Sequence, residues 1–368
     1  MHHTSDTGTF ARRTLLGSGL TLTALGVLGT SSSVTATATA EVREAAAAPA
    51  ISGTADWKAR APKGPISVLN KRTSKIVVHH TASPNVTDFS QAAAFALSRS
   101  IQKHHMDSNG WVDSGQHFTN SRGGYITEGR HRSLEALNSG TKHVLGAHTT
   151  GQNNVAFGIE NEGTYTSAIP TDAQWNSLVR LCAYMCQKHG IATSAIFGHR
   201  DFNNTACPGN LLYGRLSELR RAVAATLGAA PEADPITWRL VQPGDTGERV
   251  LVAQYLFRAM GEAKVQATGV YDEELDAAVR RLEAKHGIPS SGLVGAETWP
   301  LIVAPVKLGH NGEAVRALQL LLTAHGVANR SDGVLDGRVD SAIRGFQASN
   351  GLRVTGEATA DTWRHLLF

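Results

Sequence analysis

Hydrophobic and polar residues follow two kinds of pattern between residues 66 and 228. Short runs rich in β-branched residues, such as KIVVHH at residues 75–80, are typical of buried strands. Longer stretches such as DAQWNSLVRLCAYMCQKHG are typical of helices, and this one should end at Gly190. Strands interleaved with helices predict a mixed α/β domain over residues 66–228. The other expected strands lie at residues 116–120, 125–129, 155–163 and 194–200, and the other helices at residues 89–105 and 210–228.

A different pattern follows AAPEADP, residues 229–235, whose composition indicates a linker. Here the sequence repeats itself: GDTG at residues 244–247 recurs as GHNG at residues 309–312, and each copy ends with the letters TW. Both copies show helical periodicity that is broken by glycine turns. This predicts two small all-α modules, at residues 236–303 and 304–368.

The first 40 residues have the three parts of a secretory signal. Arg12 and Arg13 precede a diluted apolar run, TLLGSGLTLTALGVLG, and TATATA at residues 35–40 offers small-residue cleavage sites. The paired arginines favour the twin-arginine export route. A membrane anchor is disfavoured because the apolar run is shorter than the roughly 20 residues that span a bilayer. We expect a signal peptide at residues 1–40, a flexible leader at residues 41–65, and a mature protein that is secreted or held in the cell wall.

Composition narrows the classes of function. The chain of 368 residues is 41% hydrophobic and 18% charged, which suits two or three globular domains. The formal charge is only +4 and no dense run of Lys and Arg occurs, so no nucleic-acid partner is expected. A mildly basic exported protein would still be attracted to an anionic surface such as a cell wall.

Three cysteines leave at least one thiol without a disulfide partner, which needs an explanation in an exported protein. Cys182 and Cys186 lie four residues apart on one face of an expected helix, where two buried thiols are favoured over a strained bridge. Cys207 remains, either as a structural thiol or as a metal ligand.

Cys207 follows His199 by eight residues, across a loop between an expected strand and an expected helix. Pro208 favours the first turn of a helix, so the thiol would lie at a helix N-terminus, whose dipole favours thiolate. A catalytic zinc ion takes three protein ligands from His, Cys or carboxylate. His79 or His80 could supply the third ligand, but only one of them, because neighbouring strand residues point to opposite faces.

Five motifs occur in the order VVHHTA, NGWVDSGQHF, GAHTTGQN, GIENEG and GHRDFNNTACPG. Over residues 75–228 the chain therefore resembles the zinc N-acetylmuramoyl-L-alanine amidase family, which includes the peptidoglycan recognition proteins. The resemblance implies a central β-sheet flanked by helices, with zinc at the floor of a groove. It also implies hydrolysis of the amide between N-acetylmuramic acid and the L-alanine of the peptidoglycan stem peptide. By position, the zinc ligands would be His79, His199 and Cys207, and His80 would face away into the core.

The same resemblance assigns roles around the zinc ion. Glu160 matches a glutamate that many bacterial members place near the metal, where a general base is needed, and Glu162 on the same face of the strand is the alternative. Gln116 stands where the family often has tyrosine. Its amide cannot transfer a proton, but it can donate a hydrogen bond to a developing oxyanion. His148 and Thr205 are expected to border the groove as substrate-binding residues.

The two C-terminal modules resemble the peptidoglycan-binding modules that are appended to wall hydrolases. The first copy has Leu282 and Glu283 where the second has Phe346 and Gln347, and inert helical spacers are the alternative. We expect a monomeric wall amidase that binds peptidoglycan and does not stay in the membrane after signal cleavage. The competing interpretations are a non-catalytic recognition protein, which Cys207 disfavours, and a zinc peptidase that cuts within the stem, whose ligand spacing is not found.

Overall fold

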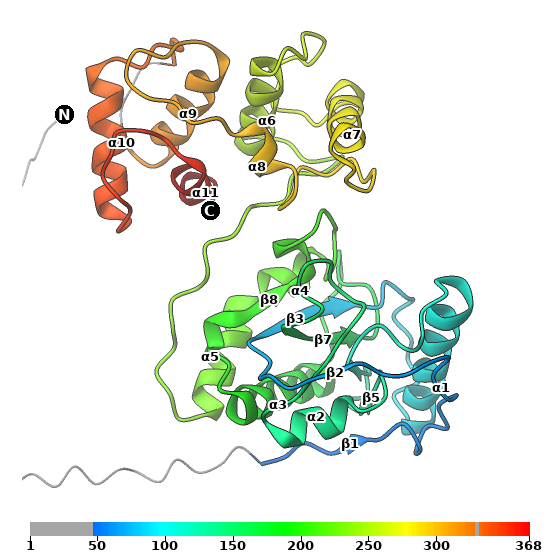
Figure 1. Cartoon of the computed structure of the whole chain (residues 1–368). Helices are drawn as coiled ribbons and strands as arrows, with labels where there is room; N and C mark the ends of the chain where they lie inside the picture. Colours follow the sequence, from blue (N-terminus) through cyan, green and yellow to red (C-terminus); the bar gives the residue numbers. More distant parts are fainter. Residues whose placement is uncertain (1–46, 328–330) are drawn as a thin grey trace, which may run out of the picture. The chain divides into compact units, whose positions relative to one another are not determined.

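The computed structural model describes residues 47–327 and 331–368 (Figure 1). The predicted signal peptide at residues 1–40 lies outside the described residues. Within the described ranges, no helix has both the length and the apolar character that crossing a membrane requires.

A mixed six-stranded sheet forms the centre of the first domain, which confirms the α/β prediction (Figure 1). The strand order is β1-β5-β4-β7-β3-β8, and every neighbouring pair is parallel except β4 with β5. A separate antiparallel pair joins β2 and β6. The strands are β1 (Ile51–Ser52), β2 (Val68–Leu69), β3 (Lys75–His80), β4 (Phe118–Asn120), β5 (Ile126–Glu128), β6 (His143–Val144), β7 (Ala156–Asn161) and β8 (Ile196–Gly198).

The run KIVVHH forms β3, in which every residue after Lys75 is buried. β3 lies between two parallel neighbours, β7 and β8. A strand that is covered on both faces has a continuous run of apolar residues rather than alternating apolar and polar residues. This explains why the sequence pattern identified β3 so clearly.

Helices cover the sheet, and α3 and α5 pack against each other over a common core (Figure 1). α3 begins after Thr171, whose side chain caps it, and ends at Gly190 in the left-handed conformation, as predicted. Cys182 and Cys186 of α3 are buried free thiols, so no bridge joins them. The helices are α1 (Gln91–Lys103), which continues as a π-helix (His104–Ser108), α2 (Ser133–Ser139), α3 (Asp172–His189), α4 (Asn210–Gly214) and α5 (Leu216–Thr226), with short 3₁₀ turns at Thr193–Ala195 and His199–Asp201.

Part of the expected flexible leader belongs to the folded domain. β1 pairs in parallel with β5, with Ile51 opposite Ile126. Trp57 is fully buried, and its indole N–H donates a hydrogen bond to the carbonyl oxygen of Glu128 at 2.8 Å. The expectation of a loose segment over residues 41–65 was therefore wrong for the part from Ile51 to Trp57. A two-residue strand and a single tryptophan leave no periodic signal in an Ala- and Pro-rich stretch.

The two C-terminal modules are all-α, as predicted, and share one hydrophobic core (Figure 1). A glutamine that recurs in the repeat motif holds a loop in each copy. Oε1 of Gln254 accepts the backbone N–H of Gly269, and its Nε2 donates to the carbonyl of Val270. Gln319 makes the corresponding pair in the second copy. The helices are α6 (Glu248–Ala259), α7 (Glu273–His286), α8 (Trp299–Ile302), α9 (Glu313–Ala324), α10 (Gly337–Ser349) and α11 (Ala360–Leu367).

The departure of the first module from the repeat pattern leaves its architecture intact. Oε2 of Glu283 accepts the backbone N–H groups of Ser291 and Gly292, both at 2.9 Å. Gln347 accepts two consecutive backbone N–H groups in the same way in the second module. A carboxylate oxygen accepts hydrogen bonds as readily as an amide oxygen, so the loop is held in both copies.

Replacing the buried tryptophan tests whether the N-terminal segment belongs to the fold. Trp57→Ala should lower the free energy of unfolding of the first domain by about 3–5 kcal/mol, because it opens a large cavity in a packed interior. Urea denaturation measures this change. Tyr125→Ala is the control: that ring is 40% exposed, so its removal should matter by no more than about 0.5 kcal/mol. Equal, small effects of both substitutions would contradict the packing role of this segment.

Candidate functional site

The carboxyl ends of three adjacent parallel strands, β7, β3 and β8, place the candidate site. His79 of β3 pairs in register with Glu160 of β7. Val78 of β3 pairs with Gly198 of β8, so His199, the next residue, comes level with His79. In sheets with parallel strands, ligands bind at this end of the strands.

His79, His199 and Cys207 present ligand atoms that all lie within 4.8 Å of one another. The two imidazole centroids are 4.5 Å apart, and Sγ of Cys207 lies 3.7 Å from Nδ1 of His79. Ligand atoms of a tetrahedral zinc site are roughly 3.3–3.8 Å apart, so these groups need to approach only slightly. Among the residues that the structure describes, this is the only group of three or more His, Cys, Asp or Glu side chains arranged to hold a metal.

Burial keeps both imidazoles neutral, with a lone pair available to a metal. It lowers the pKa of His199 to about 4. It also lowers the pKa of His79 well below its ordinary value, and the charges that neighbouring imidazoles would carry add to this effect. The two histidines therefore need not release a proton near neutral pH in order to coordinate a cation.

The thiol does not lie at a helix N-terminus, contrary to the expectation. α4 begins only at Asn210 and is five residues long. Burial raises the pKa of the Cys207 thiol, and the nearby charge of Glu160 raises it further. The chain by itself thus favours the protonated thiol, whereas a coordinated divalent cation would deprotonate it.

His80 does not belong to the cluster of metal-ligand candidates. Its Nδ1 accepts the backbone N–H of Tyr165 at 3.2 Å, which fixes the ring. Its own backbone N–H donates to Sγ of Cys207 at 3.4 Å. Of the two adjacent histidines, the structure therefore brings His79 to His199 and Cys207.

A cavity of about 450 Å³ opens over this cluster. Two aromatic residues in its lining were missed from the sequence. Trp111 and His105 have ring centroids 4.7 Å apart, and Nδ1 of His105 accepts the backbone N–H of Gly115. The motif NGWVDSGQ was the only sequence signal for Trp111. His80, which was expected to face away into the core, also lines this cavity. The residues expected to bind metal, catalyse or contact substrate all line it: His79, Gln116, His148, Glu160, His199, Thr205 and Cys207.

Glu160 provides the carboxyl group of the cavity. Its Oε2 is buried and has no hydrogen-bond partner, and burial raises the pKa of Glu160 to about 8. The alternative, Glu162, is occupied elsewhere, because its Oε2 accepts the backbone N–H of Arg122 at 2.7 Å. Glu162 does not line the cavity. The geometry thus favours Glu160 as the group that faces a substrate.

His148 contacts the metal-ligand candidate His79 as well as the cavity. Its Nε2 lies 3.1 Å from the carbonyl oxygen of Ala156, which can only accept, so this nitrogen carries the proton. Its Nδ1 is therefore an acceptor, and it lies 3.1 Å from Nε2 of His79 and 2.9 Å from Oγ1 of Thr149. That hydroxyl in turn lies 3.2 Å from Nε2 of His79. His79 then carries its proton on Nε2 and presents the lone pair of Nδ1 toward Cys207.

Gln116 and Thr205 are held by short local contacts. Nε2 of Gln116 donates to Oγ1 of Thr119 at 2.9 Å, whereas the buried Oε1 has no partner. A threonine hydroxyl both donates and accepts, so the reversed amide would satisfy the same contact and turn its NH₂ group toward the unpartnered side. Oγ1 of Thr205 accepts the backbone N–H of Cys207 at 3.1 Å and so steadies the ligand loop.

Known proteins resemble both parts of the chain. Residues 69–210 match the family model described as N-acetylmuramoyl-L-alanine amidase. Residues 246–302 and 311–366 each match the model of a putative peptidoglycan binding domain.

Three relatives show the extent of the similarity. Peptidoglycan-recognition protein SC2 of Drosophila melanogaster is 31% identical over 44% of this chain and 81% of its own length. The N-acetylmuramoyl-L-alanine amidase CwlL of Bacillus licheniformis is 24% identical over 78% of this chain and 90% of its own. A human N-acetylmuramoyl-L-alanine amidase is 35% identical over 50% of this chain, but the match spans only 31% of the human protein.

Among solved structures, wild-type Drosophila PGRP-LB matches 50% of this chain and 99% of its own, with 24% identity and a TM-score of 0.40.

The two family models and the relative SC2 together identify the family. The chain belongs to the N-acetylmuramoyl-L-alanine amidase family that includes the peptidoglycan recognition proteins, and two copies of a putative peptidoglycan binding domain follow its amidase domain.

Proposed function

We propose that the protein is a secreted, zinc-dependent N-acetylmuramoyl-L-alanine amidase that its C-terminal modules hold on the cell wall. It would cleave the amide between N-acetylmuramic acid and the L-alanine of the stem peptide. The observation that carries this proposal is the convergence of His79, His199 and Cys207 at the carboxyl ends of β3 and β8, beside the unpartnered Oε2 of Glu160.

The donor set fits zinc. Two neutral imidazoles and one thiol are ligands that zinc prefers, and three protein ligands leave a position for water and substrate. The cavity of about 450 Å³ above the three side chains has room for both. When bound there, zinc polarises the scissile carbonyl and lowers the pKa of water toward neutrality.

The chain's own residues would carry out the proton transfer and stabilise the charge that develops on the substrate. Glu160 takes the proton of the attacking water and returns it to the leaving amine of L-alanine. A nearby divalent cation favours the carboxylate form and so lowers the pKa of Glu160 toward the range that a general base needs. Gln116 donates a hydrogen bond to the carbonyl oxygen as negative charge develops on it. Trp111 lines the approach to these groups.

His148 would act as a positioning residue for zinc binding. Together with the Thr149 hydroxyl, it would hold the Nε2 proton of His79 and so fix both the tautomer and the ring orientation of that ligand. Partners of this kind raise metal affinity because the ligand is already oriented when the ion arrives.

The ligand assignment and the reaction are tested together. His79→Ala, His199→Ala and Cys207→Ser should each lose bound metal, measured by metal analysis of the purified protein. They should also stop releasing peptides with free L-alanine amino termini from wall fragments, measured by mass spectrometry. His80→Ala should keep its metal, because that ring bonds the Tyr165 backbone.

Three outcomes would contradict this scheme. Metal loss in His80→Ala but not in His79→Ala would show that the assigned ligand is wrong. A wild-type protein that binds wall fragments without cutting them would be a recognition protein. Products cut within the stem would identify a peptidase.

Glu160→Gln should change the pH dependence of stability in the metal-free protein. The pKa of Glu160 is about 8 in the fold, against an ordinary value of 4.5. Stability from this raised pKa is fully present below pH 4.5 and is lost as pH rises to 8, by a few kcal/mol in total. The variant has no such loss, so its melting temperature relative to wild type should rise between pH 5 and pH 8, as thermal unfolding measures.

Glu162→Gln is the matched control, because its carboxylate is already hydrogen-bonded to a backbone N–H. It should not gain melting temperature with pH. In the loaded enzyme, Glu160→Gln should also lower kcat by about 10²–10⁴-fold. A melting-temperature difference that is constant across pH would contradict the raised pKa.

Substitution of His148 tests its positioning role through metal affinity. His148→Ala should weaken zinc binding by about 10–100-fold, measured by competition with a chelator. His148→Asn should restore much of the affinity, because the Oδ1 of asparagine can occupy the place of Nδ1 and accept the same proton. Circular dichroism controls for folding. Unchanged zinc affinity in His148→Ala would exclude the role.

A further inference from the structure

The loop that carries two of the metal-ligand candidates also contacts the first C-terminal module. This loop, residues 199–207, begins with His199 and ends with Cys207. Asn203 and Asn204, in the middle of the loop, form hydrogen bonds with side chains of the module. The amidase domain and both modules belong to one compact unit of the chain, so this contact is internal to that unit.

Asn204 makes most of the contact. Its backbone N–H donates to Oε2 of Glu297 at 2.8 Å, and its Oδ1 accepts the backbone N–H of Glu297 at 3.0 Å. Its Nδ2 donates to Oγ1 of Thr298 at 2.7 Å and to Oε1 of Glu283 at 3.3 Å. Nδ2 of Asn203 adds a bond to Oε1 of Glu297 at 3.3 Å. We call this set of hydrogen bonds the Asn204 latch.

The second module lacks two of the residues that permit this latch. A Cβ atom on Gly295 would lie only 2.8 Å from Oδ1 of Asn204, so the close approach requires glycine. The repeat places Thr359 at the corresponding position of the second module, and Asp361 where the first has Glu297. The differences between the two copies therefore coincide with the contact that the first copy makes.

A cavity of about 570 Å³ lies at this contact, and residues of both domains line it. Trp111, His148, His199 and Thr205 line this cavity as well as the one over the metal-ligand candidates, so the two cavities adjoin. The first module contributes the loop at residues 287–289. The volume is in the range of small-ligand sites, about 300–1,000 Å³.

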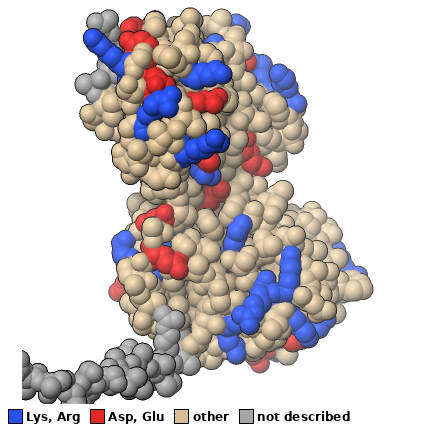
Figure 2. Space-filling view, turned by 60° about the vertical axis from the view of Figure 1, so that its left-hand side comes forward, with Lys and Arg blue, Asp and Glu red and all other residues tan. Residues whose placement is uncertain are grey.

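The lining of this joint cavity combines apolar surface with uncharged hydrogen-bonding groups. Trp111 and Ile288 bring apolar surface from the two domains, and Thr150 and Asn153 bring a hydroxyl and an amide. Among the described residues that line it, Glu297 alone carries a formal charge, and the latch occupies its carboxylate. Over the modules in Figure 2, by contrast, basic and acidic side chains are interspersed. Such a lining suits uncharged sugar or peptide groups better than an ion.

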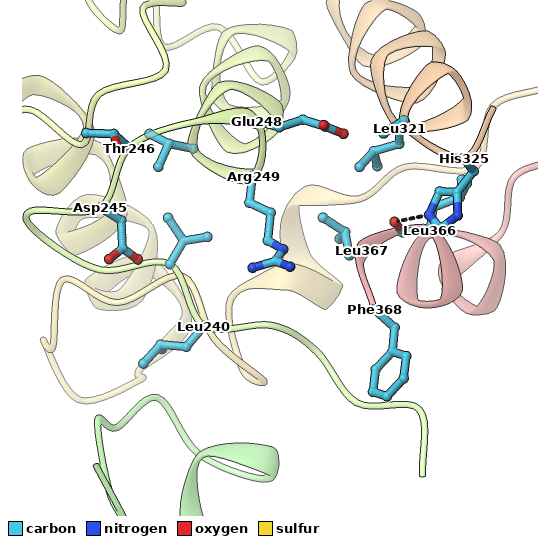
Figure 3. A pocket seen from close by; sticks show the side chains of 13 residues that line it. Leu240, Asp245, Thr246, Glu248, Arg249, Leu321, His325, Leu366, Leu367 and Phe368 are labelled. Atoms are coloured by element: carbon cyan, nitrogen blue, oxygen red, sulfur yellow. Dashed lines mark hydrogen bonds between the residues drawn. The ribbon is translucent and has the colours of Figure 1, made fainter. Parts of the chain in front are cut away.

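The Asn204 latch positions both modules, because they form one packed body. They share a hydrophobic core, and Arg258 of α6 pairs with Glu313 of α9 at 2.9 Å. Leu240 of the first module and Leu367 of the second also line a common cavity of about 520 Å³ (Figure 3). Attachment of the first module to the amidase domain therefore places the second module as well.

We propose that the Asn204 latch docks the first module beside the catalytic cavity, so that its loop at residues 287–289 forms part of the substrate groove. The inference rests on the proposed function, which takes peptidoglycan as the substrate. A substrate that reaches the metal-ligand candidates then contacts the module in the same groove. Asn204 and Glu297 are positioning residues, and the first module contributes to substrate selection in addition to holding the wall.

Two variants of the full-length protein release the latch in different ways. Glu297→Ala removes the acceptor of the Asn204 N–H, and Gly295→Thr places a side chain where Asn204 lies. The second module already has threonine at the latter position, so the module fold accommodates it. Each variant should raise KM for a soluble disaccharide muropeptide by about 10-fold, the loss expected from one or two ordinary hydrogen bonds. Bound metal and kcat should change little, because the lost contacts serve binding.

Asp361→Ala is the matched control. Asp361 has the position of Glu297 in the second module, and it pairs with Arg364 at the surface. Its removal should leave KM unchanged, whereas Glu297→Gln should keep part of the affinity because its amide oxygen still accepts the N–H. Circular dichroism controls for folding. Unchanged KM in both Glu297→Ala and Gly295→Thr would overturn the proposal, as would an equal rise in Asp361→Ala.

Hydrogen exchange, followed by mass spectrometry, measures docking without any substrate. The backbone N–H of Asn204 is bonded to Glu297, so residues 199–207 should exchange faster in Glu297→Ala than in wild type. Asp361→Ala should exchange as wild type does. Unchanged exchange in Glu297→Ala would overturn the latch, and faster exchange without a rise in KM would overturn the shared groove.

Product analysis of wall fragments separates this inference from the proposed activity. If wild type releases peptides with free L-alanine amino termini but the latch variants match it in KM and exchange, only the latch fails. If wild type releases none while exchange still depends on Glu297, the proposed activity fails. Calorimetric affinity for the same muropeptide then takes the place of KM, and equal affinity of wild type and Glu297→Ala would overturn the shared groove.

Discussion

The parallel pairing of β3 with β7 and β8 is the constraint on which the site depends. Register places His79 beside Glu160 and level with His199, so three chemical groups from distant parts of the chain meet at one strand end. A slip of one residue would turn every side chain of β3 to the opposite face and present His80 in place of His79. The buried Val and Ile residues of β3 hold the register, because each of them would lose its packing in the shifted strand.

Desolvation links this geometry to the chemistry. The cavity keeps the imidazoles neutral, the Cys207 thiol protonated and the Glu160 carboxyl without a partner. Such an arrangement is unfavourable in the metal-free chain. A divalent cation would deprotonate the thiol and favour the carboxylate, so binding energy and protonation state are coupled. The low local dielectric would also strengthen every interaction with a polarised carbonyl.

The C-terminal modules show how a repeat gains a feature that no single copy has. Gln254 and Gln319 make the same hydrogen bonds to a loop backbone in their respective modules, and this keeps the two folds alike. Packing them on a shared core then creates a cavity from unequal faces, because the start of α6 in one copy meets α9 and α11 of the other.

Much of the secondary structure and domain organisation could be predicted from local sequence patterns. The buried run of β3, the end of α3 at Gly190 and the duplicated helical modules all follow from short-range patterns, because strand burial, helix caps and repeats are encoded within a few tens of residues. The order of the five motifs indicated the family, and through it the ligand set.

Residue spacing alone did not decide between His79 and His80 as the metal ligand, or between Glu160 and Glu162 as the general base. Each choice depends on contacts with other strands. The burial of Trp57 could not be predicted either, because it depends on contacts with a distant strand. The contact between His148 and His79 joins residues 69 positions apart, and the cavity at the start of α6 is lined by residues of both modules. Such features arise only when the folded chain brings distant residues together, because no local pattern records which partner a side chain will meet.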